Sequence, residues 1–210
     1  MASHVRIDQV VTSGQFTLDG GSWDVDNNVW VVGDDTEAVV VDAAHDAEAI
    51  EAALGGRRLV AILCTHGHND HVNAALDLAS RQEAPVLLHP DDRVLWDMTH
   101  DTAPDGELGH GQVVRVGDVA VEVIHTPGHA PGACCLYAPD LGVVFSGDTL
   151  FNGGPGATGR SYSDFGTIVE SIEQRLLTLP EHTRVLTGHG DETTIGAEAP
   201  HLQEWIDRGH

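Results

Sequence analysis

The chain has 210 residues with an ordinary hydrophobic share of 41%, which suits a single domain spanning residues 1–210. Its 33 acidic residues face 10 basic ones, all of them arginine, so the formal net charge is -23. That charge excludes nucleic acid and anionic membranes as expected partners, because proteins bind both through Lys and Arg.

The first half of the chain predicts strands that alternate with short helices. Val-rich runs of about five residues between turn formers are typical of strands. Asp46 is placed to cap a helix that Gly55 and Gly56 end, and an Ala- and Leu-rich segment predicts the next helix. These patterns predict strands over residues 28–32, 38–42 and 59–65 and helices over residues 47–54 and 73–81.

The second half contains three further β-rich segments and two helical ones. A long segment behind Ser163, its expected N-cap, places apolar residues on one helical face. Pro200 is placed to open a last helix. We therefore expect strands over residues 119–125, 142–146 and 184–187 and helices over residues 164–179 and 200–205.

Four of the expected strands lead directly into polar clusters. In layered α/β proteins, ligands bind at the end of the sheet where such loops gather. The sequence therefore predicts one functional site built from four loops. The clusters occupy residues 66–71, 126–129, 147–148 and 188–189.

Cysteine usage and targeting segments indicate the cellular compartment in which a protein is expected. Three cysteines, of which Cys134 and Cys135 are adjacent, provide no disulfide framework, and Cys64 is expected to be a small buried hydrophobe. The sequence has no run of about 18 apolar residues and no N-terminal signal segment. We expect a cytoplasmic protein.

The densest polar cluster holds His66, His68, Asp70 and His71 within six residues. His66 and His68 are two residues apart, so their rings can converge on one cation. Asp70 and His71 lie beyond them and can reach a second. Imidazole nitrogen and carboxylate oxygen together suit Zn²⁺, Fe²⁺ or Mn²⁺, and no cysteine is placed to complete a closed structural zinc site.

Three further candidates for metal binding follow later strands. His129, Asp148 and His189 each lie in one of the polar clusters, and each has a glycine neighbour, which lets the backbone come close to a ligand. On spacing alone, His125 competes with His129 for the ligand role.

These motifs resemble those of the metallo-β-lactamase-fold hydrolases. Residues 65–71 match the family's Thr-His-x-His-x-Asp-His, and His129 stands in a Thr-Pro-Gly-His setting. Asp148 stands in Ser-Gly-Asp-Thr, and His189 matches the last histidine of the pattern. The similarity runs from about residue 27 to residue 189. It implies an α/β fold, a four-layer αβ/βα sandwich with two central mixed sheets.

The resemblance also implies a ligand set for two divalent metal ions, with Zn²⁺ as the expected metal and Fe²⁺ or Mn²⁺ as alternatives. Asp70 and Asp148 are implied to have catalytic roles. The family pattern assigns the first ion to His66, His68 and His129 and the second to Asp70, His71 and His189, with Asp148 bridging the two.

Within the family, the sequence is most similar to the glyoxalase II-like thioesterases. The β-lactamases often carry Cys where this chain has Asp148, and the nucleases carry basic extensions that this acidic chain lacks. The loop with Arg160 and Tyr162 resembles the thioesterases' Gly-Ser-x-Gly-Arg-Thr-Asp segment, which makes both residues candidates for substrate binding.

The resemblance therefore implies a binuclear metal-dependent hydrolase of a small-molecule thioester or ester, acting by attack of a metal-bridging hydroxide. A thioester of a small thiol carrier is favoured, with acyl- or formyl-mycothiol as one candidate. Two alternatives stay open. A single Fe²⁺ held by a subset of these ligands would suit a persulfide dioxygenase of the same fold, and a non-enzymatic metal-binding module would need no open coordination position.

Overall fold

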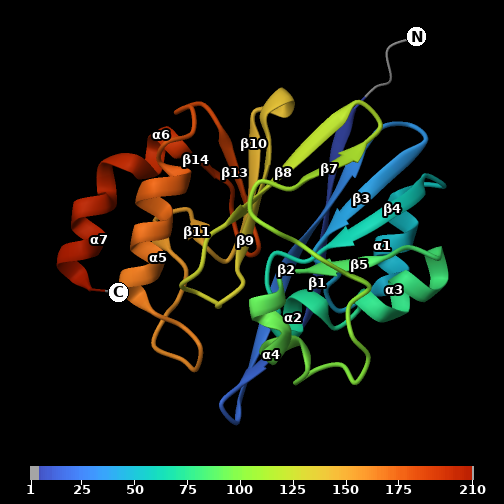
Figure 1. The fold of residues 1–210 in the computed structure, drawn as a ribbon, viewed down its shortest axis with the longest axis horizontal. Coiled ribbons are helices and arrows are strands. Elements are labelled where there is room, and N and C mark those ends of the chain that lie inside the picture. Colours follow the sequence, from blue (N-terminus) through green and yellow to red (C-terminus); the bar gives the residue numbers. More distant parts are fainter. Residues whose placement is uncertain (1–4, 210) are drawn as a thin grey trace.

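Two six-stranded sheets pack face to face in the computed structural model, which describes residues 5–209 (Figure 1). In hydrogen-bonding order, the first sheet consists of β1 (Arg6–Leu18), β2 (Gly21–Gly33), β3 (Glu37–Val41), β4 (Arg58–Leu63), β5 (Val86–Leu88) and β6 (Gly106–Glu107). The second consists of β14 (Thr193–Thr194), β13 (Arg184–Thr187), β10 (Val143–Gly147), β9 (Cys134–Ala138), β8 (Val119–His125) and β7 (Val113–Val116). A separate short hairpin is formed by β11 (Leu150–Phe151) and β12 (Gly154–Pro155).

Both sheets are mixed, as the family resemblance implies. In the first sheet β1, β2 and β3 are antiparallel neighbours, whereas β3 to β6 are parallel. In the second sheet β10 and β13 are parallel and the remaining neighbours are antiparallel. Parallel neighbours in one sheet end at the same edge, so the loops after β10 and β13 of the second sheet can meet there.

Helices cover the outer faces of both sheets, which completes the predicted four-layer sandwich (Figure 1). The first sheet is covered by α1 (Ala47–Leu54) and α3 (Ala75–Gln82), and the second by α5 (Phe165–Ser171) and α7 (Leu202–Arg208). The shorter helices are α2 (Asn69–Val72), α4 (Arg93–Trp96) and α6 (Ile195–Glu198). Within residues 5–209, no helix is long and apolar enough to cross a membrane.

Strand β3 shows why these strands are apolar throughout. Successive side chains of a strand point to opposite faces of the sheet. Val39 and Val41 therefore enter the core between the two sheets, while Ala38 and Val40 enter the core beneath α1 and α3. Both faces of a central strand are buried, so both need apolar side chains. Cys64 is also fully buried in the core, as expected.

The predicted helix over residues 164–179 differs from the structure at both ends. Its N-cap is Asp164, whose carboxylate accepts from the Thr167 amide at 2.7 Å. The hydroxyl of Ser163, the expected cap, instead donates to the Arg160 carbonyl at 2.7 Å. The α-helix ends at Ser171 and continues as a π-helical stretch, Ile172–Leu176.

Other boundaries move by a few residues. The strand expected over residues 59–65 ends at Leu63, and the helix expected over residues 73–81 begins at Ala75. Residues 69–72 form α2, so Asp70 and His71 lie on a helical turn. Pro200 lies in a 3-10 turn that precedes α7. The long hairpin of β1 and β2 extends well beyond the predicted strand over residues 28–32.

Candidate metal centre

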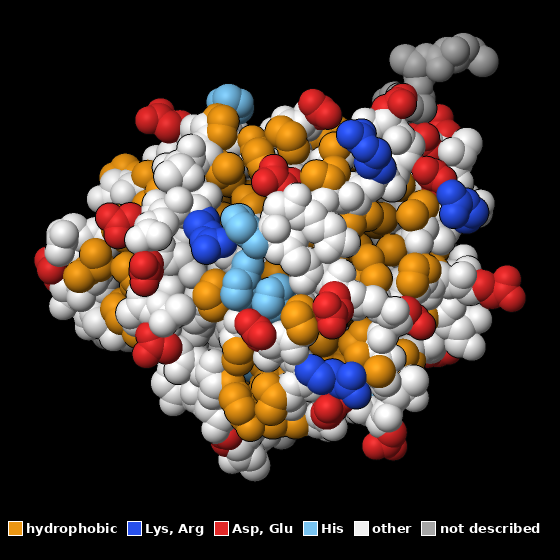
Figure 2. All heavy atoms as spheres, in the orientation of Figure 1, with side chains coloured by type: hydrophobic (Ala, Val, Ile, Leu, Met, Phe, Trp, Pro, Cys, Tyr) orange, Lys and Arg blue, Asp and Glu red, His pale blue; other side chains and the backbone are white. Residues whose placement is uncertain are grey.

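The structure brings the seven predicted metal-binding residues together at one end of the two sheets. His66 and His68 lie in the loop after β4, and Asp70 and His71 follow on α2. The other three lie just after strands of the second sheet: His129 after β8, Asp148 after β10 and His189 after β13. The prediction that polar loops gather at one edge is confirmed. On the face drawn in Figure 2, histidine side chains gather near the centre, with hydrophobic and acidic side chains around them.

His66, His68 and His129 form a first group, in which one nitrogen of each ring lies within 4.8 Å of the others. The Nδ1 of His129 donates to the Ala157 carbonyl at 2.8 Å, so its Nε2 carries no proton and has a free lone pair. That Nε2 lies 3.1 Å from the Nδ1 of His68. The three rings converge on one point, and because all three are buried this point is shielded from water.

Asp70, His71 and His189 form a second group, whose ligand atoms also lie within 4.8 Å of one another. The Nδ1 of His71 donates to the Asp42 carboxylate at 2.9 Å, and the Nδ1 of His189 donates to the Asp26 carbonyl at 2.7 Å. These outer bonds turn the two Nε2 atoms toward each other, 3.2 Å apart. Neutral rings in this arrangement present two acceptors to one point, which a cation satisfies.

Asp148 lies between the two groups. Its Oδ1 is 3.3 Å from the Nε2 of His71, and its Oδ2 is 3.5 Å from the Nε2 of His189 and 3.6 Å from the Nε2 of His129. A side chain at Gly188 would not fit, because its Cβ would come within 2.4 Å of the Asp148 carboxylate. The geometry agrees with a carboxylate shared by two cations.

The donor atoms themselves fit a pair of divalent cations. Several buried polar atoms of the two groups have no hydrogen-bond partner among the described residues, and each such atom costs about 1–3 kcal/mol if nothing binds it. Imidazole nitrogen with carboxylate oxygen is a donor set for Zn²⁺, Fe²⁺ or Mn²⁺. The unpartnered atoms include His66 Nε2, Asp70 Oδ1 and Asp148 Oδ1.

The two groups differ in their affinity for protons. Burial lowers the pKa of all three histidines in the first group, that of His68 to about 3, so these rings are neutral. Burial acts in the same direction on His71 and His189, but the nearby carboxylates, Asp148 foremost, outweigh it. They raise the pKa of His71 well above its usual range and that of His189 to about 10.

We expect metal binding to release about one to two protons per chain at pH 7.5, all from the second group, because a cation must replace the protons held by His71 and His189. Each such proton weakens the apparent affinity about tenfold for every pH unit below the pKa of its histidine. Titration calorimetry in buffers of different ionisation enthalpy measures the release. An enthalpy independent of the buffer would show that the second group is neutral before metal binds.

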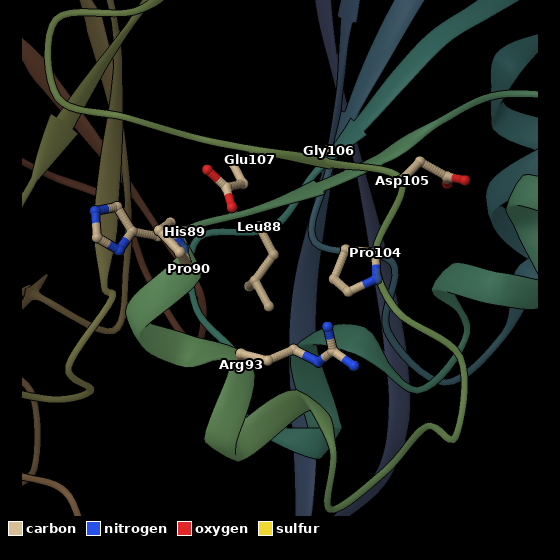
Figure 3. Close-up of a pocket in the computed structure, with 8 residues that line it drawn as sticks. All are labelled: Leu88, His89, Pro90, Arg93, Pro104, Asp105, Gly106 and Glu107. Atoms are coloured by element: carbon tan, nitrogen blue, oxygen red, sulfur yellow. The ribbon is translucent and has the colours of Figure 1, made fainter.

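His125, the competitor of His129, lies outside both groups. Its ring stacks on His89 with 4.0 Å between centroids and 9° between planes, and its Nε2 donates to the Pro131 carbonyl. Asp91 lies close enough to form a separate group with these two histidines. Parallel rings direct their in-plane lone pairs side by side, so they do not converge on one cation. Figure 3 shows His89 at the edge of a separate hollow of about 320 Å³.

Two buried carboxylates that support the site were missed by the sequence analysis. Asp42 accepts from the Thr65 amide and hydroxyl, both at 2.7 Å, as well as from His71. Asp92 accepts from the amides of Gly67 and Gly132, in the loops that carry His68 and His129. Burial raises the pKa of Asp92 to about 6. Asp42 directly follows an apolar strand, whereas Asp92 lies in a 3-10 turn four residues after β5 ends and had no such signal.

A hollow of about 220 Å³ opens beside the two groups. Phe16 and Trp23, on the unpredicted part of the β1–β2 hairpin, line it together with Arg160. The Arg160 guanidinium lies 3.8 Å from the centre of the Trp23 ring and 5.4 Å from that of Phe16. The side chain of Tyr162 is 47% exposed, and this residue is not part of the described lining.

Comparison with known families adds to this geometry. Residues 23–189 match the sequence model of the metallo-beta-lactamase superfamily. The chain belongs to this superfamily. The match covers all seven candidate ligands and agrees with the extent of the resemblance seen in the sequence.

Two curated relatives have names that describe them as hydrolases. The probable metallo-hydrolase YqgX of Bacillus subtilis is 33% identical over 187 residues, which are 81% of this chain and 88% of that protein. The hydroxyacylglutathione hydrolase GloC of Haemophilus influenzae is 30% identical over 181 residues, which are 79% of this chain and 85% of that protein. These relatives support the prediction that the protein is an enzyme.

Solved structures of the superfamily share the whole architecture. The B3 metallo-beta-lactamase BLEG-1 superposes with a TM-score of 0.78 at 33% identity, covering 91% of this chain and 98% of that one. TTHA1623, solved with two irons bound, superposes with a TM-score of 0.75 at 34% identity. The match covers 83% of this chain and 93% of that one. ETHE1 of Myxococcus xanthus superposes with a TM-score of 0.74 at 25% identity. The match covers 94% of this chain and 89% of that one. The likeness and the two histidine and aspartate groups support binding of divalent metals.

Proposed function

We propose that the protein is a binuclear metal-dependent hydrolase that cleaves a thioester of a small thiol carrier. The observation that carries the proposal is the composition of the hollow beside the two metal-binding groups. Apart from the candidate ligands, its described lining consists of Phe16, Trp23, Val25, Ala157 and Arg160. None of these side chains donates a proton readily near neutral pH.

The lining decides which leaving groups are suited to the site. Hydrolysis adds water to the carbonyl carbon and breaks the bond to the leaving atom, which departs with the electron pair. A thiol with a pKa near 8.5 departs as the thiolate without receiving a proton. An amine needs a proton from an acid, and the described lining supplies none. A thioester, or an activated ester, is therefore favoured over a peptide.

The chain's own residues hold the reacting groups in place. Two cations held by the seven candidate ligands would lower the pKa of a bound water toward 7 and polarise the carbonyl oxygen. His129 and His189 keep their Nε2 atoms turned inward through hydrogen bonds to backbone carbonyls. Asp42 does the same for His71. Phe16 and Trp23 cover one side of the hollow with apolar surface, which keeps bulk water from the acyl group.

The relatives support this choice of substrate class. GloC is named a hydroxyacylglutathione hydrolase, and hydroxyacylglutathione is a thioester of a small thiol. The loop around Arg160 resembles the Gly-Ser-x-Gly-Arg-Thr-Asp segment of the glyoxalase II-like thioesterases, with Tyr162 as a departure from that pattern. Acyl- or formyl-mycothiol is our candidate when the carrier is not glutathione. Asp148 argues against β-lactams, but BLEG-1 is named a B3 metallo-beta-lactamase, so β-lactams are included among the substrates to be assayed.

We further propose that Arg160 binds the substrate. Its guanidinium stacks on Trp23 at the hollow, whereas Asp164, which could have paired with it, caps α5 instead. Arg160 is the only Lys or Arg in the described lining. In a chain of net charge -23 it provides a local positive charge for a substrate carboxylate or carbonyl, held through paired hydrogen bonds.

We expect Arg160→Ala to raise KM about 10- to 100-fold, which corresponds to the loss of charge-assisted hydrogen bonds of about 1.5–3 kcal/mol. Arg160→Lys should recover part of the loss, because Lys keeps the charge without the planar fork. Metal content and melting temperature should stay at wild-type values. If both variants keep the wild-type KM on every accepted thioester, Arg160 does not bind substrate. A lower melting temperature or lost metal would instead assign it a structural role.

The proposed function is tested by metal analysis together with a substrate screen. The purified protein is loaded with Zn²⁺, Fe²⁺ or Mn²⁺ and assayed on acyl-glutathione and acyl-mycothiol thioesters, lactones, phosphodiesters and β-lactams. We expect two ions per chain and hydrolysis of thioesters above the other classes. A single iron with oxygen uptake on a persulfide would replace the hydrolase by the dioxygenase alternative. Tight metal binding without turnover of any class would indicate a metal-binding module.

A further inference from the structure

We infer that His45 is a positioning residue for the second metal-binding group and acts through Asn27 on Asp70. The inference rests on the proposed binuclear centre. His45 lies in the turn between β3 and α1 and does not belong to either group of candidate ligands. A chain of hydrogen bonds connects it to Asp70 through one intervening side chain.

The His45 backbone amide, which can only donate, determines the direction of each hydrogen bond in the series from Asn73 to Asp70. Asn73 accepts from the His45 amide through Oδ1 at 2.6 Å, which turns its Nδ2 toward the His45 ring. That Nδ2 donates to His45 Nδ1 at 2.9 Å, so the ring proton resides on Nε2. His45 Nε2 then donates to Asn27 Oδ1 at 2.9 Å. The Asn27 Nδ2 donates in turn to Asp70 Oδ2 at 3.0 Å.

The fold leaves space for the His45 ring and holds it there. A Cβ on Gly14 of β1 would come within 2.1 Å of His45 Nδ1, so a larger residue at that position would displace the ring. His45 itself has φ 61°, a left-handed conformation that is uncommon for residues other than Gly. A strained conformation persists only where surrounding contacts hold it. The three hydrogen bonds to Asn73 and Asn27 are such contacts.

The chain of bonds sets the orientation of one metal-binding carboxylate. Asp70 Oδ2 lies 3.4 Å from His71 Nε2 and 3.3 Å from His189 Nε2, at the centre of the second group. With His45 in place, Asn27 presents its NH₂ to this oxygen. Without His45, the Asn27 amide is free to turn its oxygen toward the carboxylate, which repels it. The first group shares none of these contacts, so only the second ion should respond.

The first test measures zinc affinity by chelator competition in His45→Asn and His45→Gly. Both replacements tolerate the left-handed backbone, and neither reaches Asn27 as the imidazole does. We expect one of two zinc ions to bind about 10- to 100-fold more weakly and the other to be unchanged. His182→Asn, at an exposed histidine, is the matched control and should change neither affinity. Melting of the metal-free proteins shows whether each variant is folded.

The second test asks whether His45 acts through Asn27. In an Asn27→Ala background, His45→Gly should weaken zinc binding no further, because the connection is already cut. Additive losses would overturn the inference. So would unchanged affinity for both ions, or equal weakening of both, in a variant that melts like the wild type. Wild-type stoichiometry reports separately on the proposed centre, since a wild type that binds one ion overturns the binuclear centre and this inference together.

Discussion

We expect Asp148→Ala to lower kcat/KM on an accepted thioester about 10³-fold or more, because paired cations contribute several kcal/mol of transition-state stabilisation. Asp148 is the candidate carboxylate that contacts histidines of both groups, so its loss removes the side chain that couples the two ions. Steady-state kinetics measure the loss, and metal analysis shows how many ions each variant keeps.

Asp70→Ala is the matched variant for this prediction. Asp70 contacts His71 and His189 of the second group, so its loss should affect one ion and cost less than the loss of Asp148. A difference of about tenfold or more between the two variants is expected. Equal and mild losses for Asp70→Ala and Asp148→Ala would mean that the two groups act as independent sites without a bridging carboxylate.

His68→Ala and His129→Ala should each lower hydrolysis by more than the roughly 10- to 100-fold that outer contacts of a metal site typically cost. Each variant removes one of the three histidines of the first group, and His68 Nδ1 and His129 Nε2 lie 3.1 Å apart. At limiting zinc, one ion should be lost and the other retained. Zinc titration with a chromophoric chelator, followed by thioester kinetics, measures both effects.

His125→Ala distinguishes the two histidines that the sequence left in competition. Its ring stacks on His89 and its Nε2 donates to a backbone carbonyl, away from both groups. This variant should keep both ions and nearly all of the activity, and should melt at a lower temperature because the stacked pair is lost. If His125→Ala loses an ion and His129→Ala does not, the assignment of the first group is wrong.

Much of the fold follows from short-range patterns. The helix over residues 47–54 and the strands over residues 119–125 and 184–187 have the predicted boundaries, because a cap, a turn or an alternating run marks each end locally. The β1–β2 hairpin lacks such signals. Its outer half is polar and partly exposed, so hydrophobic periodicity did not reveal it, and Phe16 and Trp23 were missed with it.

The sequence by itself determined the identity of the donors and their positions at strand ends, since both depend on residue type and local order. Only the tertiary structure decided which nitrogen of each ring faces inward, because that depends on partners far along the chain. His189 is oriented by the Asp26 carbonyl, 163 residues away, and His129 by that of Ala157, 28 residues away. The same holds for His125, which folding turns toward His89 and away from the centre. Composition and periodicity act over a few residues, whereas these hydrogen bonds exist only after the two sheets have packed.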